Sequence, residues 1–242
     1  GKHRSHRFVA SNQLVPPLLE LPGWQEQVRL TEQCMRGERE VPEIADKWAR
    51  GPIVTMLLEL GTPRSGATTV PLRLVLSSNK VGHDFPTGPL DMIQSWVELR
   101  ITDEQQRTVF TSGLRDERHF LEPGTVLFKA EPIDQYGNLI DRHNLWEMVG
   151  VRFRRSLFPG YSDTFEYRVP CLLPGEPRPV LDKSTGDESA HRGFSMPPLG
   201  VGRYRVEAVL NYRKVDQFLI NYLLDEKLGH TSPVVEIARV AA

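Results

Sequence analysis

One histidine stands inside a loop whose composition can hold it in a fixed direction. The segment Ser78–Pro89 reads Ser-Asn-Lys-Val-Gly-His-Asp-Phe-Pro-Thr-Gly-Pro and contains His83. Pro86 fixes its own φ angle, and Gly82 and Gly88 allow turns that other residues resist, so we expect a rigid loop. An imidazole held in this way can bind a metal ion, ligate a haem iron or transfer a proton. The loop also fits a structural role, in which the ring bonds to a backbone carbonyl group.

Six further histidines are present, and none of them forms a strong metal-ligand motif. Their positions are His3, His6, His119, His143, His191 and His230. The first two are separated by two residues in a basic N-terminal arm, which is the only short pair with ligand-like spacing. His119 and His143 stand near expected hairpin ends and are interpreted as surface groups. The residue at position 230 follows a glycine at an expected helix end, where a cation suits the helix dipole.

Motifs that would indicate a known catalytic mechanism are missing from the sequence. It has no Gly-x-Ser-x-Gly, no phosphate-binding glycine loop, no His-Glu-x-x-His and no Cys-x-x-Cys. Catalysis would require scattered residues such as His83, Asp84 and Asp91 to meet in one cleft. Asp134–Asn138 superficially resembles a calcium loop but lacks the later carboxylate, so a β-turn is expected. Whether a hydrolase or oxidoreductase site exists is left open.

Composition narrows the class of protein. The 242 residues carry 30 basic and 31 acidic side chains, which argues against a nucleic-acid surface and against a polybasic membrane patch. The longest apolar stretch, Ile53–Leu60, has the length of a strand and contains a glutamate, so no membrane span is expected. The chain begins Gly1-Lys-His-Arg without methionine, and we interpret it as a processed or excised segment. Cys34 and Cys171 are compatible with one disulfide or with two thiols.

Helical patterns lie at the two ends of the chain. Residues 1–23 are basic and then proline-rich, which is typical of an extended arm. Two short helices are expected at 24–36 and 42–50, with Ile44 and Trp48 one turn apart in the second. Residues 214–228 show helical spacing, and the sequence predicts a helix packed on a sheet through one apolar stripe: Val215, Phe218, Leu219, Tyr222 and Leu223.

Between these ends the pattern is that of β-strands. Nineteen prolines and nineteen glycines divide the chain into short segments, and alternation with period two begins near residue 53. Residues 70–76 and 95–102 alternate most clearly, and Asp103–Gln106 is expected to form the hairpin turn that leads into 107–111. Further strands are predicted at 125–130, 138–141, 149–154, 161–169, 203–212 and 233–240. Residues 182–194 are polar and are predicted to form a loop.

These elements predict a mainly β protein, an antiparallel β-sandwich of the immunoglobulin or fibronectin type. Short N-terminal helices (residues 1–52) would precede the sandwich (53–242), which would carry one C-terminal amphipathic helix. Trp96 and Trp146 are expected to be buried in the sandwich core. Exposed aromatic rings, at either of these positions or at Tyr161, would instead indicate a module that binds a ligand or a protein.

Three segments of the chain resemble the C-terminal region of bacterial multihaem c-type cytochromes of the cytochrome c554-like group. The first is Ser5-His-Arg-Phe8 with Ser11-Asn12. The second is Gly82-His-Asp-Phe-Pro-Thr-Gly88 with Trp96-Val-Glu98 and Val109-Phe-Thr-Ser-Gly113. The third is Val209-Leu-Asn-Tyr-Arg-Lys214. Together they run through nearly the whole chain, and the second is the most specific.

The resemblance implies an accessory, non-catalytic β-sandwich domain of an extracytoplasmic multihaem cytochrome. Such a domain would pack on haems held by another domain or subunit, support electron transfer and dock a redox partner protein. Carried over to this sequence, His6 and His83 are the positions that would give an axial ligand to haem iron. This chain departs from the family because it has no Cys-x-x-Cys-His motif, so any c-type haem would belong to a missing region or another chain. The alternative is an extracellular ligand- or protein-binding sandwich with no redox role.

Overall fold

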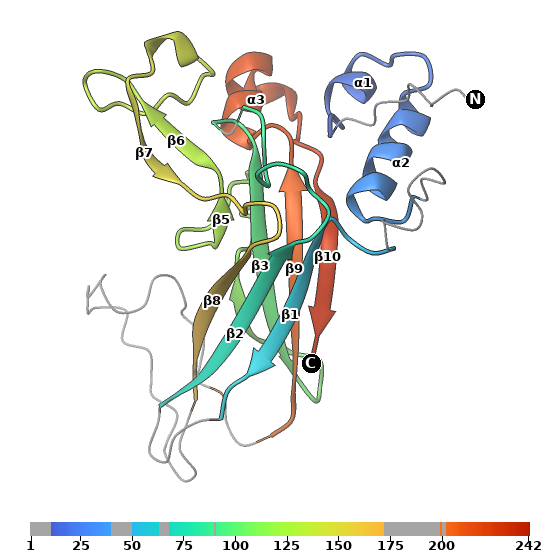
Figure 1. The fold of residues 1–242 in the computed structure, drawn as a ribbon, viewed down its shortest axis with the longest axis vertical. Helices are drawn as coiled ribbons and strands as arrows, with labels where there is room; N and C mark the ends of the chain where they lie inside the picture. Colours follow the sequence, from blue (N-terminus) through green and yellow to red (C-terminus); the bar gives the residue numbers. More distant parts are fainter. Residues whose placement is uncertain (1–10, 40–49, 63–67, 90, 172–198, 200–201) are drawn as a thin grey trace.

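The computed structural model describes residues 11–39, 50–62, 68–89, 91–171, 199 and 202–242. His3, His6 and His191 lie outside the described residues, as do the loop at 182–194 and nearly all of the helix expected at 42–50. The remainder is built mainly of antiparallel strands with a few short helices (Figure 1). No helix in the described part is both long and apolar enough to cross a membrane.

Two antiparallel sheets form the body of the molecule. One has the order β1-β2-β8, from β1 (Val54–Leu60), β2 (Thr69–Ser78) and β8 (Ser162–Pro170). The other has the order β10-β9-β3-β4, and β5 also pairs with β3. Its strands are β3 (Gln94–Asp103), β4 (Thr108–Ser112), β5 (Leu127–Phe128), β9 (Tyr204–Arg213) and β10 (Val235–Ala241).

The hydrophobic core lies between these two sheets. Leu72, Leu74 and Leu76 alternate along β2 and are almost completely buried, with Arg73 exposed between them. They share one apolar cluster with Val97, Leu99 and Ile101 of β3 and with apolar residues of β8, β9 and β10. The rings of Phe128 and Phe165 meet edge to face across the core, with centroids 5.8 Å apart. The predicted β-sandwich architecture is therefore confirmed.

Some details differ from the sequence-based expectation. Trp96 is fully buried, as expected, but it is not part of the inter-sheet core. It alternates with the core residue Val97 and so faces the other side of β3, beneath the guanidinium groups of Arg115 and Arg213. Residues 138–141 do not form a strand, and Leu139 makes only an isolated bridge to Ile133.

Two helices precede the sandwich in the part of the chain that the structure describes, and the first was not expected. α1 (Val15–Leu18) is a single turn begun by Pro16, where the sequence predicts an extended arm. α2 (Trp24–Met35) confirms the first predicted helix. Met35 lies in the sandwich core, and Arg36 donates a hydrogen bond to the carbonyl oxygen of Glu236 in β10 at 3.2 Å. The N-terminal helices are thus packed on the edge of the larger sheet.

The C-terminal helix is shorter than predicted and buries a different stripe. α3 (Gln217–Leu224) begins at Asp216, whose carboxylate accepts a hydrogen bond from the backbone amide of Leu219 at 2.8 Å. A short 3-10 turn, Glu226–Leu228, follows it. The buried apolar residues are Val215, Leu219 and Ile220. Three members of the predicted stripe are exposed instead: Phe218, Tyr222 and Leu223.

A two-stranded ribbon extends from the body beside α3 (Figure 1). It consists of β6 (Ala130–Ile133) and β7 (Gly150–Arg154), and a 3-10 turn at Leu145–Glu147 lies in their connection. Trp146 in this turn is 81% exposed, so its expected place in the core is wrong. The reason is that the ribbon pairs with no other strand in the described part, and the body offers no layer to cover it.

Candidate functional site

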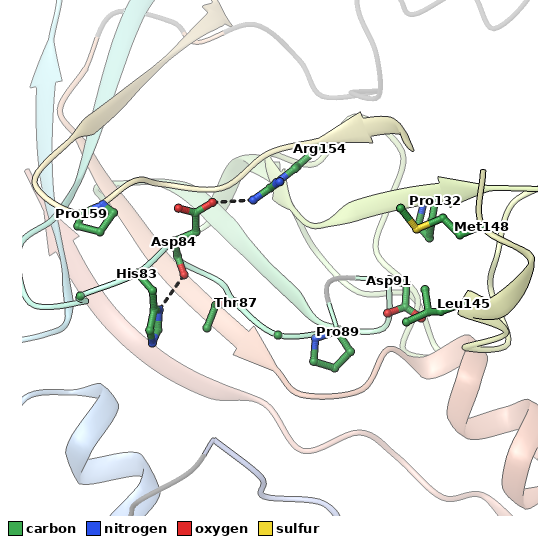
Figure 2. A pocket seen from close by; sticks show the side chains of 12 residues that line it. His83, Asp84, Thr87, Pro89, Asp91, Pro132, Leu145, Met148, Arg154 and Pro159 are labelled. Atoms are coloured by element: carbon green, nitrogen blue, oxygen red, sulfur yellow. Dashed lines mark hydrogen bonds and ion pairs between the residues drawn. The ribbon is translucent and has the colours of Figure 1, made fainter. Parts of the chain in front are cut away.

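An open cleft of about 660 Å³ lies between the His83 loop and the β6–β7 ribbon (Figure 2). The loop supplies one wall from Gly82 to Asp91, the ribbon supplies the other, and Pro159 closes one end. The walls combine apolar and charged side chains. The apolar members are Pro89, Pro132, Leu145, Met148 and Pro159. A concave surface of this size, mainly apolar with a few polar groups, is typical of a ligand site.

The His83 loop is anchored at its centre. Phe85 and Leu157 exchange two backbone hydrogen bonds of 2.8 and 2.7 Å, and Phe85 is buried. Gly88 adopts a φ angle of +95°, a conformation that side chains with a Cβ atom rarely accept. Gly82 has no such angle, and an added Cβ would meet open space, so its expected role in the turn is wrong. The sequence predicts special turn geometry at both glycines, and the structure shows a positive φ angle at Gly88 alone of the two.

His83 presents its ring to solvent at the cleft. The ring nitrogen Nδ1 lies 3.1 Å from the carbonyl oxygen of Asp84. A carbonyl oxygen can only accept a hydrogen bond, so in this contact Nδ1 carries the proton. In the neutral ring Nε2 then keeps its lone pair, and it has no hydrogen-bond partner among the described residues. The arrangement leaves one imidazole nitrogen ready to act as a ligand or a base.

The side chain of Asp84 forms contacts within the fold, unlike the exposed ring of His83. In Figure 2 its side chain points to the opposite side of the loop from His83. One carboxylate oxygen accepts hydrogen bonds from Arg154 at 2.7 Å and from the Ser156 hydroxyl at 3.1 Å. These contacts tie the loop to β7 and to the residues that follow it. They also place the Arg154 guanidinium, which is half exposed, on the wall of the cleft.

A second oriented histidine is bonded to Asp91, one of the residues that line the cleft. Nδ1 of His143 lies 2.7 Å from Oδ2 of Asp91, whose side chain is only 2% exposed and lines the cleft. Sequence reasoning missed this histidine because 52 residues separate the pair, and no local spacing links them. The one available signal was the placement of both residues in connections rather than in strands.

The three residues that a catalytic site would require, His83, Asp84 and Asp91, all line this cleft. Each of the two carboxylates, however, is already paired within the fold. Asp84 is bonded to Arg154 and Ser156, and Asp91 is bonded to a histidine. One oxygen of each carboxylate is thus engaged, while Nε2 of His83 has no partner among the described residues.

Asp91 also lines a second hollow of about 440 Å³, which has buried charged residues in its wall. Arg213 is 1% exposed and donates hydrogen bonds to Gln94 at 2.7 Å and to the His119 carbonyl oxygen at 2.8 Å. Burial lowers the pKa of Arg213 to about 10, opposed by the nearby charge of Asp216. Burial raises the pKa of Asp216, while its hydrogen bond from Leu219 acts in the opposite direction. These groups compensate one another within the fold.

The donor groups at the cleft include one imidazole with an unengaged ring nitrogen. No three His, Cys, Asp or Glu side chains converge as a metal-ion site in the part of the chain that the structure describes. A haem iron already ligated by its porphyrin needs only an axial imidazole, and His83 offers Nε2 for this purpose. The apolar residues of the wall fit a porphyrin face, and the Arg154 guanidinium suits a propionate. Cys34 and Cys171 form no disulfide bond.

Comparisons with known proteins give one distant likeness. No protein-family model matches the chain, and no match was found among curated proteins. Among solved structures, the chain is similar to a penta-haem cytochrome c552 from Thermochromatium tepidum, with 14% sequence identity and a TM-score of 0.46. The likeness covers 77% of this chain and 39% of that protein, so the chain spans well under half of the cytochrome's length.

Proposed function

We propose that this chain is a non-catalytic accessory β-sandwich domain of an extracytoplasmic multihaem cytochrome. Its cleft packs against a haem carried by another domain or subunit, and His83 provides an axial ligand. The carrying observation is the exposed ring of His83, a residue that lines the cleft: its Nδ1 is engaged by the Asp84 carbonyl oxygen, and its Nε2 has no partner among the described residues. The sequence resemblance to the multihaem family supports the same assignment.

In this proposal the residues at the cleft have separate roles. The His83 loop orients the imidazole, and the apolar wall excludes water from the face on which a porphyrin would rest. Arg154, already paired with Asp84, supplies positive charge beside that face. A c-type haem bound there would supply one-electron transfer, and the protein would tune it through the axial ligand and burial. His6, outside the described residues, remains the second predicted ligand, and a periplasmic or extracellular location is part of the proposal.

The proposal is tested with a water-soluble ferric haem c peptide that keeps one histidine ligand and has an open sixth position. Titration of the full chain should convert the peptide to a low-spin, bis-histidine visible spectrum. His83→Ala should remove a large part of this change, whereas His230→Ala, at an exposed site away from the cleft, should leave it intact. Equal spectra for wild type and His83→Ala would reject the ligand role of His83.

A second function is favoured by one observation, a set of exposed aromatic rings among the described residues. Trp146 is 81% exposed, Tyr161 is 69% exposed, and the ring of Tyr161 meets Phe158 edge to face. Exposed rings of this kind are typical of surfaces that bind a protein. A binding module without redox function would keep its partner when His83 is replaced and lose it when Trp146 is replaced by serine, and a binding assay with the two variants separates the two functions.

A further inference from the structure

The second hollow, of about 440 Å³, is lined by buried polar side chains whose hydrogen bonds within the fold are incomplete. We propose that this hollow binds a free amino acid with an apolar side chain, which it recognises through the carboxylate and the ammonium group together. The inference goes beyond the proposed function and does not depend on it, because the amino acid would bind whether or not a haem is present.

Two neighbouring strands supply hydrogen-bond donors to the hollow. Gln94 of β3 and Arg213 of β9 are partners in the sheet, and Nε of Arg213 donates to Oε1 of Gln94 at 2.7 Å. Nε2 of Gln94 and Nη2 of Arg213 have no partner among the described residues, and neither atom is fully enclosed by protein. The two residues are 9% and 1% exposed, and both line the hollow. The hollow therefore offers two unengaged N–H donors.

An acceptor comes from the residue that caps α3. Asp216 is 8% exposed and lines the hollow, and its Oδ1 accepts the hydrogen bond from the Leu219 amide. Its Oδ2 has no partner among the described residues and is not fully enclosed. Burial is the main cause that raises the pKa of Asp216, and the charges of Lys129, Arg213 and Asp91 also act on it. The acceptor and the donors thus lie within range of one another.

The charges in the wall favour a ligand that carries both signs. Among the described residues, the wall has five acidic and two basic side chains. Three of the carboxylates are engaged, two by arginines outside the wall at 2.9 and 3.8 Å and one by a backbone amide. With the His143 ring neutral, the two that remain, Asp91 and Asp216, are matched by Lys129 and Arg213. A ligand with a net charge would upset this balance in a buried space, whereas a zwitterion preserves it.

An amino acid fits the groups that the hollow presents. Its carboxylate would accept hydrogen bonds from Gln94 and Arg213, with the charge of Lys129 nearby, and its ammonium group would donate to Asp216. Hydrogen bonds between charged groups are the strongest of their kind. The rest of the wall is largely apolar and suits an apolar side chain: Phe120, Leu121, Leu127, Leu139, Ile140 and Phe218. The volume is near the lower end of the range for small-molecule sites, about 300–1,000 Å³, so a small ligand is expected.

The test is isothermal titration calorimetry of the full chain with L-leucine, which should bind at one site per chain. Two analogues each lack one charged group of leucine. These are 3-methylbutylamine, without the carboxylate, and 4-methylpentanoate, without the ammonium group. Each should bind about 10- to 100-fold more weakly than leucine, because each leaves a buried charged group of the wall without its partner.

Two variants assign the roles within the wall. Asp216→Asn keeps an oxygen that caps α3 but removes the charge, so it should weaken leucine binding about 10- to 100-fold without weakening that of 4-methylpentanoate. Lys129→Met should weaken leucine binding about 10-fold without weakening that of 3-methylbutylamine. Asp225→Asn is the matched control, because Asp225 also caps a helical turn, through the Lys227 amide, but is exposed and does not line the hollow. It should leave leucine binding unchanged.

The outcomes separate this inference from its alternatives. No binding of leucine to wild type would overturn it, and so would an analogue that binds as tightly as leucine, since the hollow would then be a simple cation or anion site. Urea unfolding shows whether each variant is folded, and unchanged leucine affinity in a folded Asp216→Asn would overturn the role of Asp216. Leucine binding without any change in the spectrum of the haem peptide would reject the proposed function and leave this inference in place.

Discussion

Single side chains at the cleft gain their chemical character from one hydrogen bond each. His83 and His143 are both engaged through Nδ1, one by a backbone carbonyl oxygen and the other by a carboxylate. The two hydrogen bonds differ in strength, because a hydrogen bond to a charged acceptor is stronger than one to a neutral acceptor. We therefore expect the direction of the His143 ring to be the better defined of the two.

The buried charges behind the cleft give a prediction for pH dependence. Burial raises the pKa of Asp216 above its ordinary value of 3.8, so above that pH the folded chain keeps a proton that the unfolded chain has released. Stability then falls as the pH rises from 3.8 through the folded pKa. Asp216→Asn keeps the hydrogen-bond cap of α3 but cannot titrate. Its free energy of unfolding, relative to wild type, should increase as the pH is raised from about 4, measured by urea denaturation.

Asp134 is the control with the opposite sign. The hydrogen bond from the Asn138 side chain lowers the pKa of the Asp134 carboxyl, together with bonds from backbone amides in the same turn. Its contribution to stability is therefore lost as the pH falls below 3.8. Asp134→Asn should become less stable relative to wild type as the pH rises through that acid range. Similar curves for both variants would contradict the assigned causes.

Among the structural elements, the loop that carries His83 depends on one glycine and not on the other. Gly88→Ala should lower the free energy of unfolding by about 1–2 kcal/mol, because a Cβ atom is strained at positive φ. Gly82→Ala is the matched control, and it should be neutral or should stabilise the chain by up to about 1 kcal/mol. Urea unfolding curves measure both, and equal losses for the two variants would contradict this account of the loop.

The pattern of residues predicted the strands well and the site only in part. Alternation along residues 70–76 and 95–102 reflects two buried sheet faces, so the positions of β2 and β3 followed directly. The exposed place of Trp146 did not follow, because its burial depends on whether another layer covers the ribbon, which no local pattern encodes. The contact between Asp91 and His143 joins two connections that alternation does not describe.

In the molecule as a whole, the inter-sheet core provides most of the stability on which the cleft rests. Leu74 is completely buried on β2, whereas Leu57 on the neighbouring strand β1 is 55% exposed. Leu74→Ala should lower the free energy of unfolding by about 2–5 kcal/mol through lost burial and the remaining cavity. Leu57→Ala should change it by about 0.5 kcal/mol. Chemical denaturation of both variants checks the assignment, and a large loss for Leu57→Ala would place the core elsewhere.

The cleft therefore sits where a stable sandwich meets a less supported ribbon. A ribbon of two strands has little stability of its own in water, and its contacts with the body decide its orientation. Among these contacts are the exchange between Phe85 and Leu157 beyond the end of β7 and the ion pair between Asp84 and Arg154.

That ion pair has a consequence for the solution behaviour of the protein. Arg154 is half exposed, so dissolved ions screen its attraction to Asp84. The contact between the His83 loop and the β6–β7 ribbon should therefore be stronger at low salt concentration and weaker at high salt concentration.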